Sequence, residues 1–110
     1  MPRPIIVITM GDPAGIGPEV IMKSLAHAEL YQRCRPVVSG DAERLRQAGR
    51  IVGAKLAVNP VRSPSEGKYQ AGTADVIDLA VVPRDLPFGQ VSAAAGEAAF
   101  RFIEKAAQLV

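Results

Sequence analysis

The stretch ITMGDPAGIGPE, residues 8–19, joins an apolar run to a helical pattern through a turn with three glycines and two prolines. The run Ile5–Thr9 is β-branched without polar alternation, which is typical of a strand buried on both faces of a parallel sheet. After the turn, Pro18 suits the first helical position, because an N–H there has no partner anyway. Apolar spacing then predicts a helix over residues 18–29. This part of the chain therefore predicts an α/β fold.

A second unit repeats the pattern. RPVVSG, residues 35–40, predicts a strand, and Asp41 is a preferred N-cap for a helix over residues 42–49, which Gly49 would stop. Weaker patterns predict strands at 55–58 and 76–82, with a loop rich in proline, serine and glycine between them. The alternation predicts an open, mostly parallel sheet flanked by helices, without an internal domain boundary over residues 1–110.

The last helix is expected to begin after Ser92, which would cap it. Its apolar face is expected at steps of three and four, at Ala95, Ala99, Phe102, Ile103, Ala106 and Leu109. The chain stops at Val110 inside that apolar period, with no capping signal. We therefore expect these residues to be the N-terminal part of a longer protein.

Composition narrows the function classes. The net charge of +2 comes from 13 basic and 11 acidic residues without a basic run, which argues against a nucleic-acid partner. No apolar stretch approaches the length of about 18 residues that a membrane span needs. The one cysteine, Cys34, permits no internal disulfide and favours a reducing, cytoplasmic location, with a structural role for its thiol.

The glycine turn has two readings. A glycine-rich turn that leads into a helix presents backbone N–H groups and a positive dipole end to an anion. Alternatively, it is a tight corner without a ligand, and neither the dinucleotide GxGxxG nor the P-loop spacing is present. Asp41 has the same ambiguity, since it could bind a ribose hydroxyl or only cap the next helix. Both readings stay open on the residues alone.

Two longer motifs resemble a known family. VITMGDPAGIGPE, residues 7–19, and GQVSAAAGEAAFRFIEKAAQLV, residues 89–110, resemble segments of the 4-hydroxythreonine-4-phosphate dehydrogenases of vitamin B6 biosynthesis. GDPAGIGPE is also similar to the GDGIGPE loop of isocitrate and isopropylmalate dehydrogenases. The resemblance implies an isocitrate/isopropylmalate dehydrogenase-like fold, and a larger protein of which this chain is the N-terminal part.

The resemblance also implies a reaction. It is the NAD- or NADP-dependent oxidation and decarboxylation of 4-phosphohydroxy-L-threonine, assisted by a divalent metal (Zn, Mg or Co), in a cytoplasmic homodimer. The family holds this metal with three histidines, and the one histidine here, His27, matches none of them. We therefore expect the metal ligands outside this chain, no catalytic residue within it, and no activity from these 110 residues alone.

Other functions stay open. A paralogue of the same class would act on a phosphorylated threonate or erythronate, or on a dihydrodiol carboxylate. A protein of another class would be a non-catalytic module that binds a nucleotide or phosphate through the glycine turn and Asp41.

By similarity to the related decarboxylating dehydrogenases, Asp12, Gly15 and Ile16 are implied to border the cofactor or substrate. Asp12 could instead only close an Asx turn, and Glu19 could serve only the helix dipole. We expect a side chain at Gly15 to be forced to positive φ. Lys68 and its neighbour Tyr69 could reach a phosphate, but a lone loop lysine is usually solvated.

Overall fold

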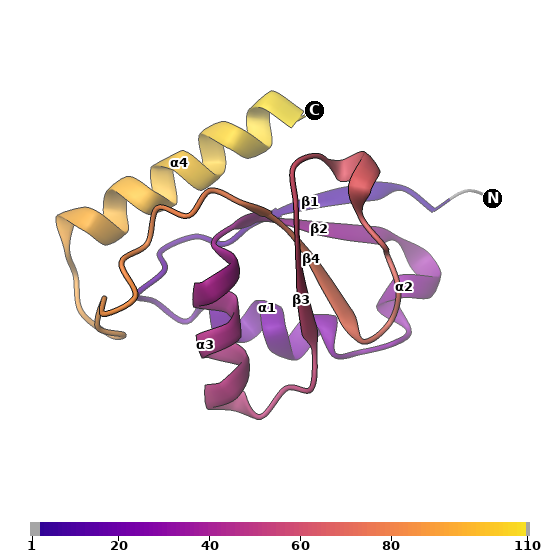
Figure 1. Ribbon diagram of the computed structural model, residues 1–110, viewed down its shortest axis with the longest axis horizontal. Coiled ribbons are helices and arrows are strands. Elements are labelled where there is room, and N and C mark those ends of the chain that lie inside the picture. Colours follow the sequence, from indigo (N-terminus) through magenta and orange to yellow (C-terminus); the bar gives the residue numbers. More distant parts are fainter. Residues whose placement is uncertain (1–2, 110) are drawn as a thin grey trace.

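The computed structural model describes residues 3–109, and its centre is a parallel sheet of four strands in the order β1-β2-β4-β3 (Figure 1). The strands are β1 (Ile5–Thr9), β2 (Arg35–Gly40), β3 (Ala57–Val61) and β4 (Thr73–Asp78). Every pairing is parallel. The predicted α/β class and parallel sheet are confirmed.

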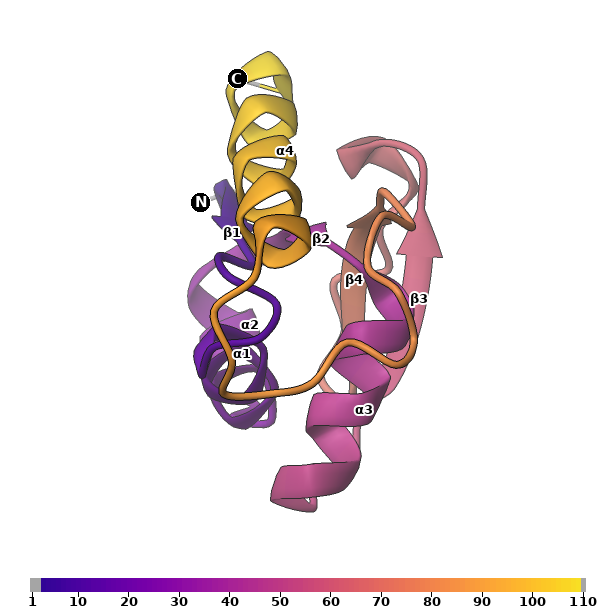
Figure 2. The same ribbon diagram turned by 90° about the vertical axis from the view of Figure 1, so that its left-hand side faces the viewer.

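Helices lie on both faces of the sheet. α1 (Gly17–Leu25) and α3 (Ala42–Val52) pack together on one face, and α4 (Ala93–Leu109) crosses the other (Figure 2). The Ser39 hydroxyl of β2 donates a buried hydrogen bond of 2.8 Å to the Phe102 carbonyl of α4. The short helix α2 (Leu30–Arg33) leads into β2.

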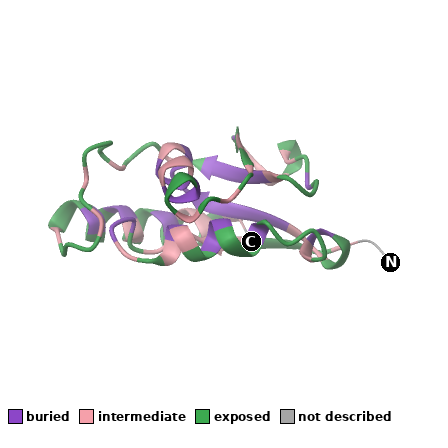
Figure 3. Cartoon of the chain, turned by 90° about the horizontal axis from the view of Figure 1, so that it is seen from below, coloured by how far each residue is buried: buried purple, intermediate pink, exposed green. Residues whose placement is uncertain are grey.

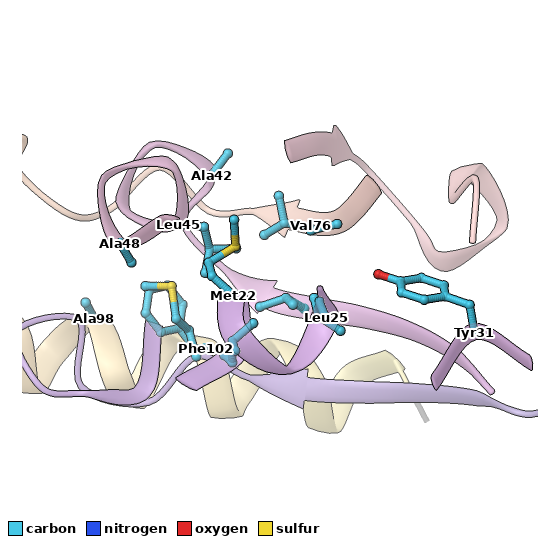
Figure 4. Packing of buried hydrophobic residues seen from close by; sticks show 13 residues of the cluster. Met22, Leu25, Tyr31, Ala42, Leu45, Ala48, Val76, Ala98 and Phe102 are labelled. Carbon is cyan, nitrogen blue, oxygen red and sulfur yellow. The ribbon is translucent and has the colours of Figure 1, made fainter. Parts of the chain in front are cut away.

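The main core lies between the α1/α3 layer and the sheet. Met22, Leu25 and Leu45 point into the same cluster as Val76 of β4 (Figure 4). A Cβ built on Gly49 would lie 2.9 Å from Cε of Met22, so this glycine allows α1 and α3 to approach closely. We had expected Gly49 to stop α3, but it does not. The helix continues to Val52 and ends at Gly53, whose φ of 70° is left-handed.

The predicted burial of β1 on both faces is wrong for the described residues. β1 lies at an edge of the sheet, and Ile5 and Ile6 are 40% and 46% exposed. Buried residues concentrate in β2 and β4, which occupy the middle of the sheet (Figure 3). The β-branched run therefore predicted the strand correctly but not its position in the sheet.

The first helix also differs from the prediction. It begins at Gly17, which makes Pro18 its second residue, and it ends at Leu25 rather than near Glu29. Exposed residues 26–29 then lead to α2, and His27 lies among them. Val20, which we had expected on the apolar stripe, is half exposed.

The last two strands are shifted from their predicted positions toward Ala57–Val61 and Thr73–Asp78. Asp75 explains the second shift, because a carboxylate inside a buried strand contradicts the apolar pattern. Here Asp75 is buried and accepts hydrogen bonds from the Asn59 amide and from the backbone N–H groups of Lys68 and Tyr69. These donors compensate the charge that the sequence pattern could not accommodate.

Ser92 caps α4 as predicted, since its hydroxyl accepts a hydrogen bond of 3.1 Å from the Ala95 N–H. The buried face of the helix consists of Ala95, Ala98 and Phe102, whereas Ile103, expected on that face, is exposed. None of the helices within residues 3–109 has the length and apolarity needed to cross a membrane.

Candidate functional site

The carboxyl ends of β1, β2 and β4 lie side by side. The Met10 N–H donates to the Ser39 carbonyl at 3.0 Å, and the Leu79 N–H donates to the Gly40 carbonyl at 2.9 Å. The glycine turn after β1, the N-terminus of α3 and the loop after β4 therefore leave the sheet at one edge. Open parallel sheets bind ligands at this edge.

Two glycines shape the turn after β1. Gly11 has a left-handed φ of 73°. A Cβ built on Gly17 would lie 2.5 Å from the Met10 carbonyl oxygen, so the chain returns to the end of its own strand. Gly15 is not among the positive-φ residues, and its Cβ would lie 3.3 Å from the Asp12 carbonyl oxygen. The conformational demand that we had placed at Gly15 therefore falls on Gly11 and Gly17.

Asp12 closes the turn internally. Its Oδ1 accepts a hydrogen bond of 2.8 Å from the Ala14 N–H, and the Gly15 N–H donates to its carbonyl at 2.9 Å. This geometry is the predicted Asx turn. The side chain is nevertheless exposed, and its Oδ2 accepts no hydrogen bond from residues 3–109. One carboxylate oxygen of Asp12 is therefore without a hydrogen-bond donor from the described part of the chain.

Ile16 and the first turn of α1 form the outer side of this turn. Ile16 is 75% exposed, and half-exposed Val20 follows it one helical turn later. Pro18 has no N–H, and the first N–H groups of a helix lack partners inside the helix. Glu19 lies in this first turn, where its charge complements the dipole. Apolar surface and backbone donors thus lie together beside Asp12.

Asp41 serves the fold with both oxygens. Oδ1 accepts from the Arg44 N–H at 2.9 Å as the N-cap of α3, and Oδ2 accepts from the Val82 N–H at 3.2 Å. The residue is only 3% exposed. Asp78 adds a second acceptor at the same helix end, for the Ala42 N–H at 3.1 Å. The capping role is confirmed, and both carboxylate oxygens are engaged by backbone N–H groups.

Arg44 connects the three segments at the sheet edge. Its Nε donates to the Pro13 carbonyl at 2.7 Å, and its Nη1 donates to the Leu86 carbonyl at 2.8 Å. The guanidinium carbon lies 3.5 Å from the centre of the Phe88 ring. Burial lowers the pKa of Arg44, and the charges of Asp41 and Asp12 oppose that shift. Arg44 thereby fixes the glycine turn and the loop after β4 to α3.

Sequence reasoning missed Arg44. An arginine in the first turns of a polar helix has the pattern of a solvated residue, yet this one is 2% exposed. Its partners Pro13 and Leu86 are both backbone carbonyls, which leave no mark in the residue pattern. The loop after β4 is held further by the Gly89 N–H, which donates to the Ala14 carbonyl at 2.6 Å.

The described residues do not fit the metal that the resemblance implies. Residues 3–109 contain no group of three histidine, cysteine, aspartate or glutamate side chains that could hold an ion. Tyr69, a candidate phosphate contact, is buried and donates its hydroxyl to the Pro64 carbonyl. Lys68 is exposed, and within residues 3–109 only its backbone N–H forms a hydrogen bond, to the Asp75 carboxylate.

Comparisons with known proteins converge on one family. The family model described as "Pyridoxal phosphate biosynthetic protein PdxA" matches residues 32–110. The D-threonate 4-phosphate dehydrogenase of Cupriavidus necator is 56% identical over 96% of this chain and 32% of its own length. A putative D-threonate 4-phosphate dehydrogenase of Symbiobacterium thermophilum is 52% identical over 97% of this chain and 32% of its own length.

Solved structures agree. A 4-hydroxythreonine-4-phosphate dehydrogenase from Burkholderia phymatum has a TM-score of 0.97 and 52% identity, over 99% of this chain and 33% of that one. The Klebsiella pneumoniae enzyme of the same name has a TM-score of 0.87 and 40% identity, over 96% of this chain and 32% of that one. The chain thus spans about a third of the length of the relatives it matches.

Proposed function

The chain belongs to the PdxA family of pyridoxal phosphate biosynthetic proteins, and from this premise we propose that it is part of a dehydrogenase for a 4-phosphorylated hydroxy acid. The observation that carries the proposal is the 56% identity to a D-threonate 4-phosphate dehydrogenase over nearly the whole chain. Because the chain covers a third of that protein, the activity is proposed for the full-length protein.

D-threonate 4-phosphate is the first candidate substrate. Relatives with this name, some of them marked putative, are 56%, 52% and 44% identical to the chain. The second candidate is 4-phosphohydroxy-L-threonine, which the name of the 52% identical Burkholderia phymatum structure favours. The two acids differ at C2, which carries a hydroxyl in the first and an amino group in the second. Phosphorylated erythronate is a related third candidate.

The residues of this chain that would take part in the reaction lie at the carboxyl ends of the strands. A bound nicotinamide cofactor, NAD or NADP, supplies the hydride acceptor. The first turn of α1 presents backbone donors and a positive dipole end to an anionic group. The free Oδ2 of Asp12 can accept a hydrogen bond from a hydroxyl, while exposed Ile16 offers apolar surface to a ring. Gly11 and Gly17 keep the turn compact enough to bring these groups together.

The remaining parts of the proposal concern the full-length protein. A divalent metal would be held by residues outside this chain. A homodimer in the cytoplasm is proposed from the resemblance to the related dehydrogenases and from the single cysteine.

The test is a turnover assay of the full-length protein with NAD or NADP, a divalent metal and each phosphorylated acid. We expect reduced cofactor to appear with D-threonate 4-phosphate, and no comparable rate with unphosphorylated D-threonate. Cofactor or phosphate binding without turnover of any of these acids would favour the alternative of a non-catalytic module.

A further inference from the structure

A pocket of about 470 Å³ lies between α3 and the loop after β4. Its lining includes Arg44, Gln47, Arg50, Arg84, Asp85 and Phe88. Three arginines thus face one carboxylate around a single hollow. An excess of positive charge in a pocket raises the local concentration of anions.

Arg44 brings an unused donor to this pocket. Three of its hydrogen bonds are made by Nε and Nη1, to Pro13, Leu86 and the Gln47 side chain. Its Nη2 is buried and has no hydrogen-bond partner among residues 3–109. Buried polar groups in native proteins nearly always have a partner, so this guanidinium nitrogen requires an acceptor that residues 3–109 do not supply.

The other two arginines are placed to meet the same acceptor. Arg84 is exposed and forms no ion pair within the described part of the chain. Arg50 is also exposed, and its contact with Glu43, at 3.6 Å, is a surface ion pair that contributes little. Both side chains are therefore available at the mouth of the pocket, while Arg44 lies in its wall.

The Phe88 ring lines the same pocket as Arg44. It stacks on the guanidinium of Arg44 at 3.5 Å, and it belongs to a loop without helix or strand. Phe88 and Arg44 therefore form one side of the pocket together.

We propose that this pocket binds a phosphate group, either free phosphate or the head of a phosphate monoester. Arginine guanidinium groups match the spacing of phosphate oxygens and form charge-assisted hydrogen bonds with them. Arg84 and Arg50 bind the oxygens at the mouth, and Nη2 of Arg44 donates from the wall. The inference stands on the pocket and is independent of the dehydrogenase activity.

The experiment titrates inorganic phosphate into the full-length protein by isothermal calorimetry. Arg84→Gln removes one charge from the pocket without touching the hydrogen bonds that Arg44 makes. Arg62→Gln is the matched control, because Arg62 is an exposed arginine outside the pocket. We expect a phosphate site, besides the one that holds the phosphate of the substrate, whose dissociation constant rises about tenfold in Arg84→Gln and stays unchanged in Arg62→Gln.

A second arm repeats the titration with D-threonate 4-phosphate. If Arg84→Gln weakens the binding of both ligands, the pocket is a site for phosphate monoesters. If it weakens the binding of inorganic phosphate alone, the pocket is a site for the free anion. Equal affinities in wild type and Arg84→Gln for both ligands would overturn the proposal, as would the absence of any phosphate binding. These outcomes do not depend on turnover, so the proposed activity can fail separately.

Discussion

The α-carbon of Gly17, the first residue of α1, lies close to Met10 at the end of β1. A Cβ on Gly17 would lie 2.5 Å from the carbonyl oxygen of Met10. Real Cβ atoms are not found at such distances from backbone. The contact means that the turn between β1 and α1 closes on itself and carries its shape without help from a ligand. The groups on this turn that we propose to bind a ligand are therefore positioned in advance.

Gly17→Ala tests this contact. The added methyl group has to displace the backbone of Met10 or of α1, and we expect the free energy of unfolding to fall by about 2–3 kcal/mol. Gly96→Ala is the control, since Gly96 lies within α4 with nothing within 4 Å of its Cβ position. That change should stabilise the protein by about 0.5–1 kcal/mol. Urea denaturation of both variants measures the difference, and equal effects would refute the close approach.

Asp41 offers a test of the capping assignment. Asp41→Ala leaves the Arg44 and Val82 N–H groups without their acceptor, and we expect a loss of about 1–3 kcal/mol in unfolding free energy. Asp41→Asn keeps a capping oxygen for Arg44, but its amide nitrogen cannot accept from Val82, so its loss should be smaller. Thermal and urea unfolding measure this order. If Asn proves as damaging as Ala, the charge rather than the cap is what stabilises the fold.

The burial of Tyr31 leads us to predict that the protein loses stability at alkaline pH. Burial, with the charges of Asp75 and Cys34, raises the pKa of Tyr31 from its ordinary value of 10.0 to about 12. The unfolded chain therefore loses this proton first, and the stability contributed by the neutral phenol, present below the unfolded pKa, is lost as the pH rises from about 10 through about 12.

The measurement compares wild type with Tyr31→Phe. The hydroxyl of Tyr31 donates to the Thr73 carbonyl at 2.8 Å, so Phe loses about 1 kcal/mol at neutral pH. Above a pH of about 10, the unfolding free energy of Tyr31→Phe should then decline less steeply than that of the wild type. Burial also raises the pKa of Tyr69, so a residual slope is expected. Parallel slopes for wild type and Tyr31→Phe would contradict the assignment.

Local patterns predicted most of the fold because local chemistry decides it. The strands Ile5–Thr9 and Arg35–Gly40 appear at their predicted limits. Asp41 caps α3 and Ser92 caps α4, as predicted. Errors arose where a distant partner decides. Asp75 interrupts an apolar pattern, but it is buried and accepts hydrogen bonds from three donors. Gly49 has no side chain because Met22 packs against it, and not because a helix ends there.

The candidate site was only partly predictable for the same reason. The sequence indicated the glycine turn and Asp12, since an aspartate in such a turn bonds its own backbone. It could not indicate which glycine is constrained, because that depends on the path of the chain back to Met10. Arg44 was out of reach as well, since its acceptors Pro13 and Leu86 lie 31 and 42 residues away in the chain.

The central claim is that the glycine turn binds a ligand in a dehydrogenase, and Asp12→Asn in the full-length enzyme tests it most directly. Asn keeps the acceptor that closes the Asx turn on Ala14, and on the free side it replaces the charged oxygen of Asp12 with an uncharged amide nitrogen that cannot accept a hydrogen bond. The measurement is kcat/KM for D-threonate 4-phosphate, together with the melting temperature. We predict a fall of about tenfold or more in kcat/KM, the cost of losing a charge-assisted hydrogen bond, with an almost unchanged melting temperature. An unchanged kcat/KM in this variant would show that the turn is only a structural corner.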